Sequence, residues 1–114
     1  MSISFGGIGE MCVTLMAASG VTKGKPVKMS TNGTVAACSD GDRFVGVAVD
    51  VSDDGYAIVQ LKGYTTMGYT GTAPTVGYNV LAANAAGGVK GANAGNECLV
   101  LEVDTTAATV GFII

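Results

Sequence analysis

Apolar and polar residues alternate along much of the chain, in short runs that end at glycine-containing turns. The run from Phe44 to Asp50 repeats with a period of two, which is the period of side chains along a β-strand. We expect one face of this strand to be buried, formed by Val45, Val47, Val49 and Val51. Burial of such a face stabilises a fold by roughly 1.5–3 kcal/mol per side chain before conformational entropy is counted.

The same reasoning predicts further strands, with short hairpin turns between them. Asn32-Gly33 provides two residues that tolerate positive φ, as a two-residue hairpin turn requires. Asp53-Asp54-Gly55 predicts another turn. The expected strands cover Glu10 to Ala17, Tyr56 to Leu61, Cys98 to Asp104 and Thr109 to Ile114.

Two stretches of the chain share a pattern of hairpin, glycine-rich loop and apolar run ending in Val-Asp. The counterpart of Val47 is Leu101, at an offset of 54 residues, and Ile58 aligns with Val110 at an offset of 52. We therefore predict an internal pseudo-repeat between residues 24–61 and residues 77–114.

The predicted fold class is all-β, with little or no helix. We expect a small barrel or sandwich built from two similar halves with short hairpins, because charge is sparse and glycine is abundant. Residues 1–20 are predicted to form an N-terminal arm and a first strand, and residues 21–114 a single β domain.

Charge argues against nucleic acid as a partner. The chain has 6 basic and 9 acidic side chains and a formal net charge of −3, whereas a nucleic-acid-binding protein needs a basic surface to neutralise phosphates. No apolar run has the length of a membrane span, and the first 20 residues lack the basic start of a signal peptide. We expect a soluble protein made in a reducing cytoplasm.

No catalytic or cofactor-binding constellation stands out. Histidine, the commonest general base, is absent, and the three cysteines show no CxxC spacing, so we expect no metal site and no disulfide framework. Asp50 and Asp104 are the one acid pair that the pseudo-repeat could bring together for acid–base chemistry. The segment from Asp50 to Gly55 resembles a calcium loop but lacks the acid needed at Leu61. We predict that the protein is not an enzyme and binds no cofactor.

Two segments are candidates for contact with other proteins. The first nine residues are either a disordered leader or an arm that orders against a partner. From Gly63 to Val89 the chain carries no charge, which is typical of an interface core and equally of a second buried β segment. The candidate interface residues are Ile3, Phe5, Ile8, Tyr64, Met67, Tyr69 and Tyr78.

The first half of the chain resembles the capsid cement, or head decoration, proteins of tailed bacteriophages. In that family, a Gly-x-x-Val-x-x-x-x-x-Gly-x-Val hairpin is followed by Phe-x-Gly-Val-Ala. The matching residues here are Gly24, Val27, Gly33, Val35, Phe44, Gly46, Val47 and Ala48. The match covers residues 24–63, and the chain is also similar in length and texture to the lambda-type decoration protein.

This resemblance implies a β-tulip-like fold and a protein that stabilises an assembled shell on the outside of the virion. It implies a homotrimer whose partner is the major capsid protein, without any cofactor, nucleic acid or membrane. The chain departs from the lambda type in lacking its proline-rich leader and its tryptophans. Two alternatives stay open: another virion module, such as a tail tube or fibre, and a carbohydrate-binding module that stacks sugars on Tyr64, Tyr69 and Tyr78.

Overall fold

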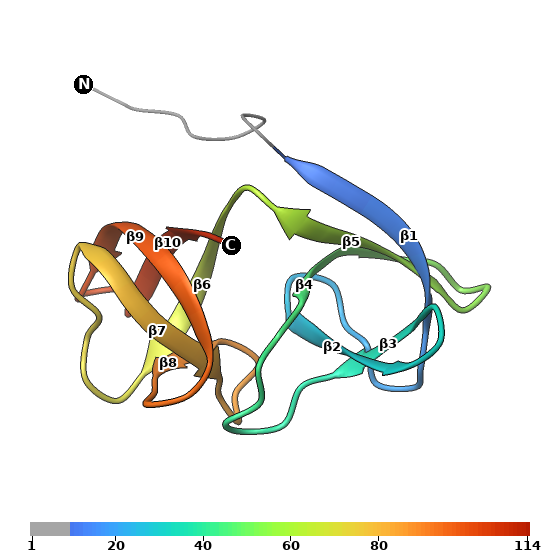
Figure 1. Cartoon of the computed structure of the whole chain (residues 1–114), viewed down its shortest axis with the longest axis horizontal. Helices are drawn as coiled ribbons and strands as arrows, with labels where there is room; N and C mark the ends of the chain where they lie inside the picture. Colours follow the sequence, from blue (N-terminus) through green and yellow to red (C-terminus); the bar gives the residue numbers. More distant parts are fainter. Residues whose placement is uncertain (1–9) are drawn as a thin grey trace.

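The structure, a computed structural model, describes residues 10–114 as ten β-strands joined by turns and loops (Figure 1). Within this range no helix forms, which confirms the predicted all-β class. The strands are β1 (Met11–Ala17), β2 (Pro26–Thr31), β3 (Thr34–Ala37), β4 (Gly46–Val51), β5 (Tyr56–Lys62), β6 (Tyr64–Thr70), β7 (Gly77–Ala83), β8 (Val89–Gly91), β9 (Asn96–Asp104) and β10 (Thr109–Ile113).

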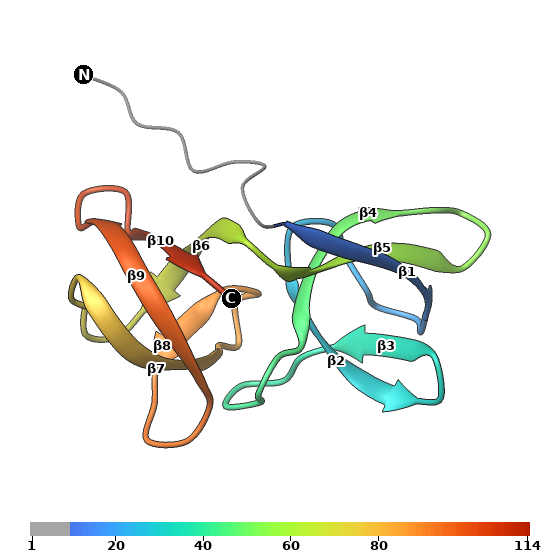
Figure 2. The same ribbon diagram turned by 45° about the horizontal axis from the view of Figure 1, so that its top comes forward.

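The strands close into two small five-stranded barrels that lie side by side (Figure 1, Figure 2). The first barrel has the strand order β1-β3-β2-β4-β5, and the second has the order β10-β6-β8-β7-β9. Each barrel contains one parallel pair, β1 with β3 and β6 with β8, and every other pair is antiparallel. The two halves therefore share one topology, in which β6 to β10 repeat β1 to β5.

Hairpin turns form where glycine allows positive φ. Gly33 has a φ of 65° and Gly87, at the equivalent turn of the second barrel, has a φ of 82°. Gly24, which precedes β2, and Gly77, the first residue of β7, have φ values of 84° and 110°. These residues direct the chain into the same hairpin in each half.

The register of the last strand differs from the sequence alignment by one residue. Leu15 on β1 faces Ala57, and Met67 on β6 faces Val110, so Ala57 rather than Ile58 is the counterpart of Val110. Ile58 is exposed, whereas Val110 is fully buried. The sequence alignment was wrong here, because a slip of one residue exchanges the two faces of a strand.

β4 is also built differently from the prediction of one buried valine face. Val47 is buried in a cluster with the second barrel, whereas Ala48, next to it, is buried in the core of the first. A bulge between Ala48 and Asp50 then turns Val51 towards the first core, and Val45 is exposed. Because β4 belongs to the first barrel and Val47 packs against the second, both faces of β4 are covered near Val47, and a period of two does not describe its burial.

The two barrels have cores of unequal size. The first core consists of valines and alanines: Val27, Val35, Ala48, Ala57 and Val59. At the positions equivalent to Ala48, Ala57 and Val59, the second core has Val100, Val110 and Phe112. Since each additional buried methylene contributes about 0.8 kcal/mol, these three positions contribute more to the core of the second barrel than to that of the first.

Phe44 joins the two barrels. It precedes β4 of the first barrel, yet its side chain is 1% exposed and packs in the core of the second. Its ring centroid lies 6.2 Å from that of Phe112, at an interplanar angle of 60°. Its backbone N–H donates to Asn96 Oδ1 at 3.1 Å, and Asn96 Nδ2 donates to its carbonyl at 2.8 Å. The loop before β4 is thereby fixed to the second barrel.

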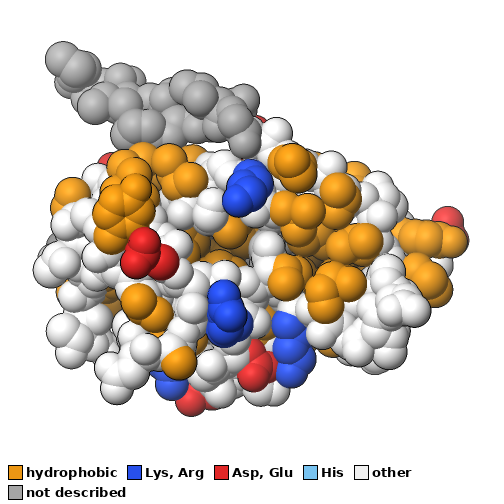
Figure 3. All heavy atoms as spheres, viewed as in Figure 1, with side chains coloured by type: hydrophobic (Ala, Val, Ile, Leu, Met, Phe, Trp, Pro, Cys, Tyr) orange, Lys and Arg blue, Asp and Glu red, His pale blue; other side chains and the backbone are white. Residues whose placement is uncertain are grey.

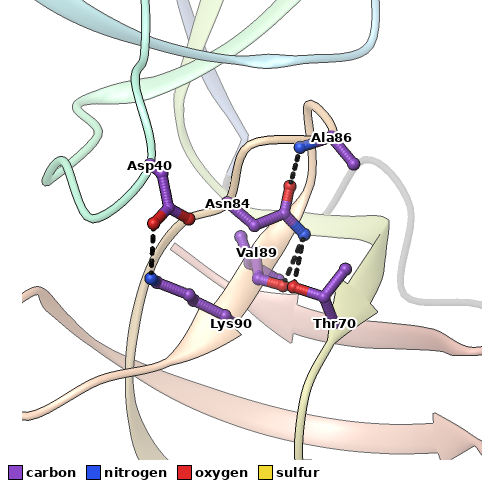
Figure 4. A network of polar contacts seen from close by, with 6 residues as sticks. All are labelled: Asp40, Thr70, Asn84, Ala86, Val89 and Lys90. Carbon is purple, nitrogen blue, oxygen red and sulfur yellow. Dashed lines mark hydrogen bonds and ion pairs between the residues drawn. The ribbon is translucent and has the colours of Figure 1, made fainter.

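Polar contacts extend this junction along the same loop. Ala83 at the end of β7 exchanges backbone hydrogen bonds with the loop, accepting from Gly41 at 2.8 Å and donating to Asp42 at 2.9 Å. Lys90 on β8 pairs with Asp40 at 2.9 Å (Figure 4). Next to this pair, the buried Asn84 bonds the carbonyl of Val89 and the Thr70 hydroxyl (Figure 4), which fixes the turn between β7 and β8.

Candidate interaction surfaces

The predicted interface residues occupy very different environments. Met67 is buried in the core of the second barrel, so its side chain is not part of the surface, and Tyr69 packs partly buried against the same core. Tyr78 on β7 is 73% exposed. Ile3, Phe5 and Ile8 lie outside the residues that the structure describes.

Tyr64 lies on the outer face of β6 and is held there. Its hydroxyl donates to Glu102 Oε1 at 2.9 Å, and its phenol lies over Gly111, where a Cβ atom would collide with it. Partial burial is the largest cause that raises the pKa of the phenol above its usual value. Because side chains alternate along a strand, Tyr64 and Tyr69 point to opposite faces of β6. The three tyrosines expected for sugar stacking are therefore not gathered on one surface.

The uncharged segment of the second barrel presents two neighbouring apolar side chains to solvent. Val76, in the loop before β7, is 70% exposed, and Tyr78 lies two residues further on. The preceding Thr75 exchanges hydrogen bonds with the side chain of Asn79: Asn79 Nδ2 donates to its carbonyl at 2.6 Å. This bonding fixes the loop conformation that displays Val76 and Tyr78. We call the pair the β7 edge.

The first barrel carries a second apolar surface that the sequence analysis did not identify. Thr14 faces Ile58 and Met16 faces Tyr56 across β1 and β5, so these side chains share the outer face of the barrel. Met16, Tyr56 and Ile58 are 54%, 49% and 40% exposed. Figure 3 shows hydrophobic side chains at the surface of both halves of the molecule. We call this surface, formed by Thr14, Met16, Tyr56 and Ile58, the β1–β5 face.

A groove of about 690 Å³ lies where the barrels meet. Leu61 and Ile114, at equivalent ends of β5 and β10, form part of its apolar lining. Arg43, Lys62 and Glu97 carry the charges around it. Phe44, which joins the two barrels, also lines this groove, so the groove is part of the barrel junction.

The two carboxylates considered for acid–base chemistry are in separate places. Asp50 lines a hollow of the first barrel and Asp104 a hollow of the second, so the pseudo-repeat does not bring them together. Asp104 Oδ1 instead accepts the backbone N–H groups of Thr106 and Ala107, both at 3.0 Å, in the β9–β10 turn. In residues 10–114 no group of three or more cysteine, aspartate or glutamate side chains is arranged to hold a metal ion.

The cysteines differ in environment. Burial raises the pKa of the Cys38 thiol to about 11, and it does the same for Cys98. Both therefore stay protonated at neutral pH, and the thiolate is the reactive form. Cys12 is exposed on β1.

The eight residues that carry the resemblance to decoration proteins have structural roles. Gly24 and Gly33 form turns, and the valines Val27 and Val35 fill the first core. In the second part of the motif, Phe44, Val47 and Ala48 are buried, and a Cβ atom on Gly46 would collide with the carbonyl oxygen of Gln60. The motif residues thus shape the turns and the cores of the fold.

Comparison with known proteins does not assign a family. The chain matches none of the protein-family models against which it was scanned, and a search of curated proteins finds no relative. The described segments also contain no helix long and apolar enough to cross a lipid bilayer.

Proposed function

We propose that the chain is a head decoration protein, which binds the outer surface of an assembled bacteriophage capsid and stabilises it. The observation that carries this proposal is the exposure of Val76 and Tyr78, at 70% and 73%, in a stretch without charged residues. Tyrosine and apolar residues without charge are typical of the core of a protein–protein interface. The resemblance of the hairpin motif adds the class of partner, the major capsid protein.

The fold supports this function in a second way. Five of the eight motif residues lie in the two barrel cores, so the motif specifies a β scaffold, and apolar side chains such as Val76 and Tyr78 are exposed on that scaffold. Weak attachment of single copies is sufficient, because repeated copies on a shell multiply the contacts, with avidity gains of roughly 10²–10⁴. The protein would be made in the host cytoplasm and would act on the virion exterior.

Co-sedimentation of the purified chain with empty, expanded heads of the phage that encodes it tests the proposal. We expect the double variant Val76→Ser, Tyr78→Ser to lower the head-bound fraction at least tenfold, because each change removes apolar area from the docking surface. Met29→Ser, which alters an exposed methionine of the first barrel, is the matched control and should bind like wild type. Wild-type protein that stays in the supernatant would refute the proposal.

A further variant tests the N-terminal arm. Deletion of residues 1–9 should weaken attachment and leave the two barrels folded, if Ile3, Phe5 and Ile8 contact the shell. Unchanged occupancy of the heads would remove the arm from the docking surface.

The alternative of a tail-tube or fibre module has its own test. Electron microscopy of the concentrated protein alone would favour that alternative if it showed tubes or rings.

A further inference from the structure

Asn32 differs from the other asparagines of the chain in its neighbour and in its surroundings. The sequence contains five asparagines, and only Asn32 is followed by glycine. Asn32 and Gly33 are both exposed, at the turn between β2 and β3. Within residues 10–114, Asn32 is bonded through its backbone carbonyl, which accepts the Thr34 hydroxyl at 3.2 Å, and its side-chain amide has no partner. This amide is therefore free to react.

Three of the other asparagines, Asn79, Asn84 and Asn96, use their side-chain amides to bond the backbone. Asn84, in the equivalent turn of the second barrel, is 3% exposed, and its Oδ1 accepts the N–H of Gly88 at 2.7 Å. Asn93 is exposed in the loop between β8 and β9, but alanine follows it. A Cβ atom on the following residue hinders approach to that residue's backbone nitrogen, and glycine has none. Asn93 is thus a control that the chain itself supplies.

The backbone nitrogen of Gly33 is accessible from the same turn. Gly33 has a φ of 65°, and beyond the adjoining residues no atom lies within 4 Å of the position that a Cβ atom would take. Among the turn and loop hydrogen bonds of the described chain, Gly33 takes part through its carbonyl oxygen, which accepts the Met16 N–H at 2.9 Å, and not through its own N–H. Reaction at this nitrogen therefore breaks none of the bonds that hold the turn.

We propose that Asn32 is a site of spontaneous covalent modification, at which the chain rearranges to isoaspartate. The Gly33 nitrogen attacks Cγ of Asn32, its proton leaves with the side-chain nitrogen as ammonia, and a five-membered succinimide forms. Water then opens this ring at either carbonyl, which gives aspartate or isoaspartate. Water is the co-reactant, and no atom is oxidised or reduced. Either product replaces a neutral amide with a carboxylate and adds one negative charge to the formal net charge of −3.

Isoaspartate in this turn loosens the closure of the first barrel. It directs the main chain through the Cβ atom of the modified residue, which adds one atom to the main chain of the turn. The adjoining parallel ladder of β1 and β3, which holds the barrel closed, pairs Met16 with Thr34 and Ala17 with Val35. The bond from Met16 to the Gly33 carbonyl extends this ladder into the turn. Displacement of that carbonyl weakens the ladder, and the second barrel has no Asn-Gly turn at which the same reaction occurs.

Incubation of the full chain at 37 °C and about pH 8.5, sampled over several weeks, tests the proposal by peptide mass spectrometry. Trypsin releases residues 29–43, in which Asn32 is the only asparagine, and residues 91–114, which contain Asn93 and Asn96. We expect the first peptide to gain one dalton roughly ten times faster than the second, because Gly33 lacks a hindering Cβ atom. Asn32→Gln should abolish this gain, since glutamine has to close a larger ring. Equal rates in the two peptides, or an unchanged rate in Asn32→Gln, would overturn the proposal.

The consequence for the fold has its own readout. Asn32→Asp carries the charge of the isoaspartate form on a normal main chain and is the matched control. We expect the isoaspartate form, isolated from aged protein by ion-exchange chromatography, to exchange its Met16 amide hydrogen about tenfold faster than Asn32→Asp. The Tyr69 amide, which donates to Ala108 at 3.0 Å in the second barrel, should keep its protection. Equal protection of Met16 in the two proteins would refute the loosening of the first barrel. Neither measurement involves heads, so the proposed function stands or falls separately.

Discussion

Ala108 is the one described residue other than glycine that has a positive φ, 55°. It ends the turn between β9 and β10, and Gly55 holds the equivalent place between β4 and β5 with a φ of 89°. A residue with a Cβ atom in this region is strained by about 1–2 kcal/mol, whereas glycine is not. The second barrel therefore stores a small amount of strain at a turn that the first barrel makes without it.

Ala108→Gly should stabilise the protein by roughly 0.5–1 kcal/mol, because relief of backbone strain exceeds the added chain entropy of glycine in the unfolded state. Urea denaturation measures this difference. The reciprocal change, Gly55→Ala, should destabilise by about 1 kcal/mol, since no atom lies within 4 Å of the position of its new Cβ and the cost is conformational. A loss of stability in Ala108→Gly would contradict this account of the turn.

At the scale of elements, the loop between β3 and β4 holds the barrels together through Phe44. Truncation at this position leaves a cavity in the second core and releases the loop from the junction. Phe44→Ala should lower the free energy of unfolding by about 3–5 kcal/mol, as measured by denaturant titration. Val45→Ala is the matched control, because its side chain is adjacent but exposed, and its effect should stay below about 1 kcal/mol. Similar effects of the two changes would contradict the central role of Phe44.

The same loop is tied to β2 by a charged pair. Lys28 Nζ lies 2.7 Å from Asp42 Oδ2, which also accepts the backbone N–H of Ser39 at 2.8 Å. The hydrogen bond from Lys28 is the largest cause that lowers the pKa of Asp42, and the same bond raises the pKa of Lys28. The Asp42 contribution to stability is thus present above its unfolded pKa of about 3.9 and is lost as the pH falls through the lower folded value. The Lys28 contribution is complete below about pH 10.4 and is lost above it, as the pH rises through the raised folded pKa.

Asp42→Asn should therefore lower the urea midpoint at pH 7 and flatten the decrease in midpoint between pH 5 and pH 2. Titration of the midpoint against pH for both proteins is the measurement. Asp53→Asn, in the exposed turn between β4 and β5, serves as the control and should keep the wild-type profile. A profile for Asp42→Asn that parallels the wild type down to pH 2 would show that this pair does not couple protonation to folding.

At the scale of the whole molecule, the sequence predicted the parts of the fold that are encoded locally. The turn at Gly33, the presence of the strands and the similarity of the two halves were readable, because turn residues and apolar–polar patterns are local signals, although alternation did not predict the burial of β4. The parallel pairs β1–β3 and β6–β8 leave no such signal, since they join strands that are distant along the chain. Burial of Phe44 in the opposite barrel is likewise a tertiary contact without a local pattern.

The candidate surfaces were predicted less well than the fold. Tyr78 is exposed, whereas Met67 is a core residue, because its position on β6 points inward opposite Val110. The β1–β5 face was missed because Tyr56 and Ile58 alternate with the equally apolar Ala57 and Val59, so hydrophobicity does not distinguish the inner from the outer face. Comparison of the two barrels, position by position, is the signal that reveals it.

The proposal for the whole molecule is that a two-barrel scaffold, joined through Phe44, presents the β7 edge to a capsid shell. Electron cryomicroscopy of expanded heads saturated with the protein tests this most directly. The account predicts regularly spaced two-barrel density on the outer surface, with Val76 and Tyr78 of the second barrel against the shell. Bare heads, or density attached only through the first barrel, would contradict it.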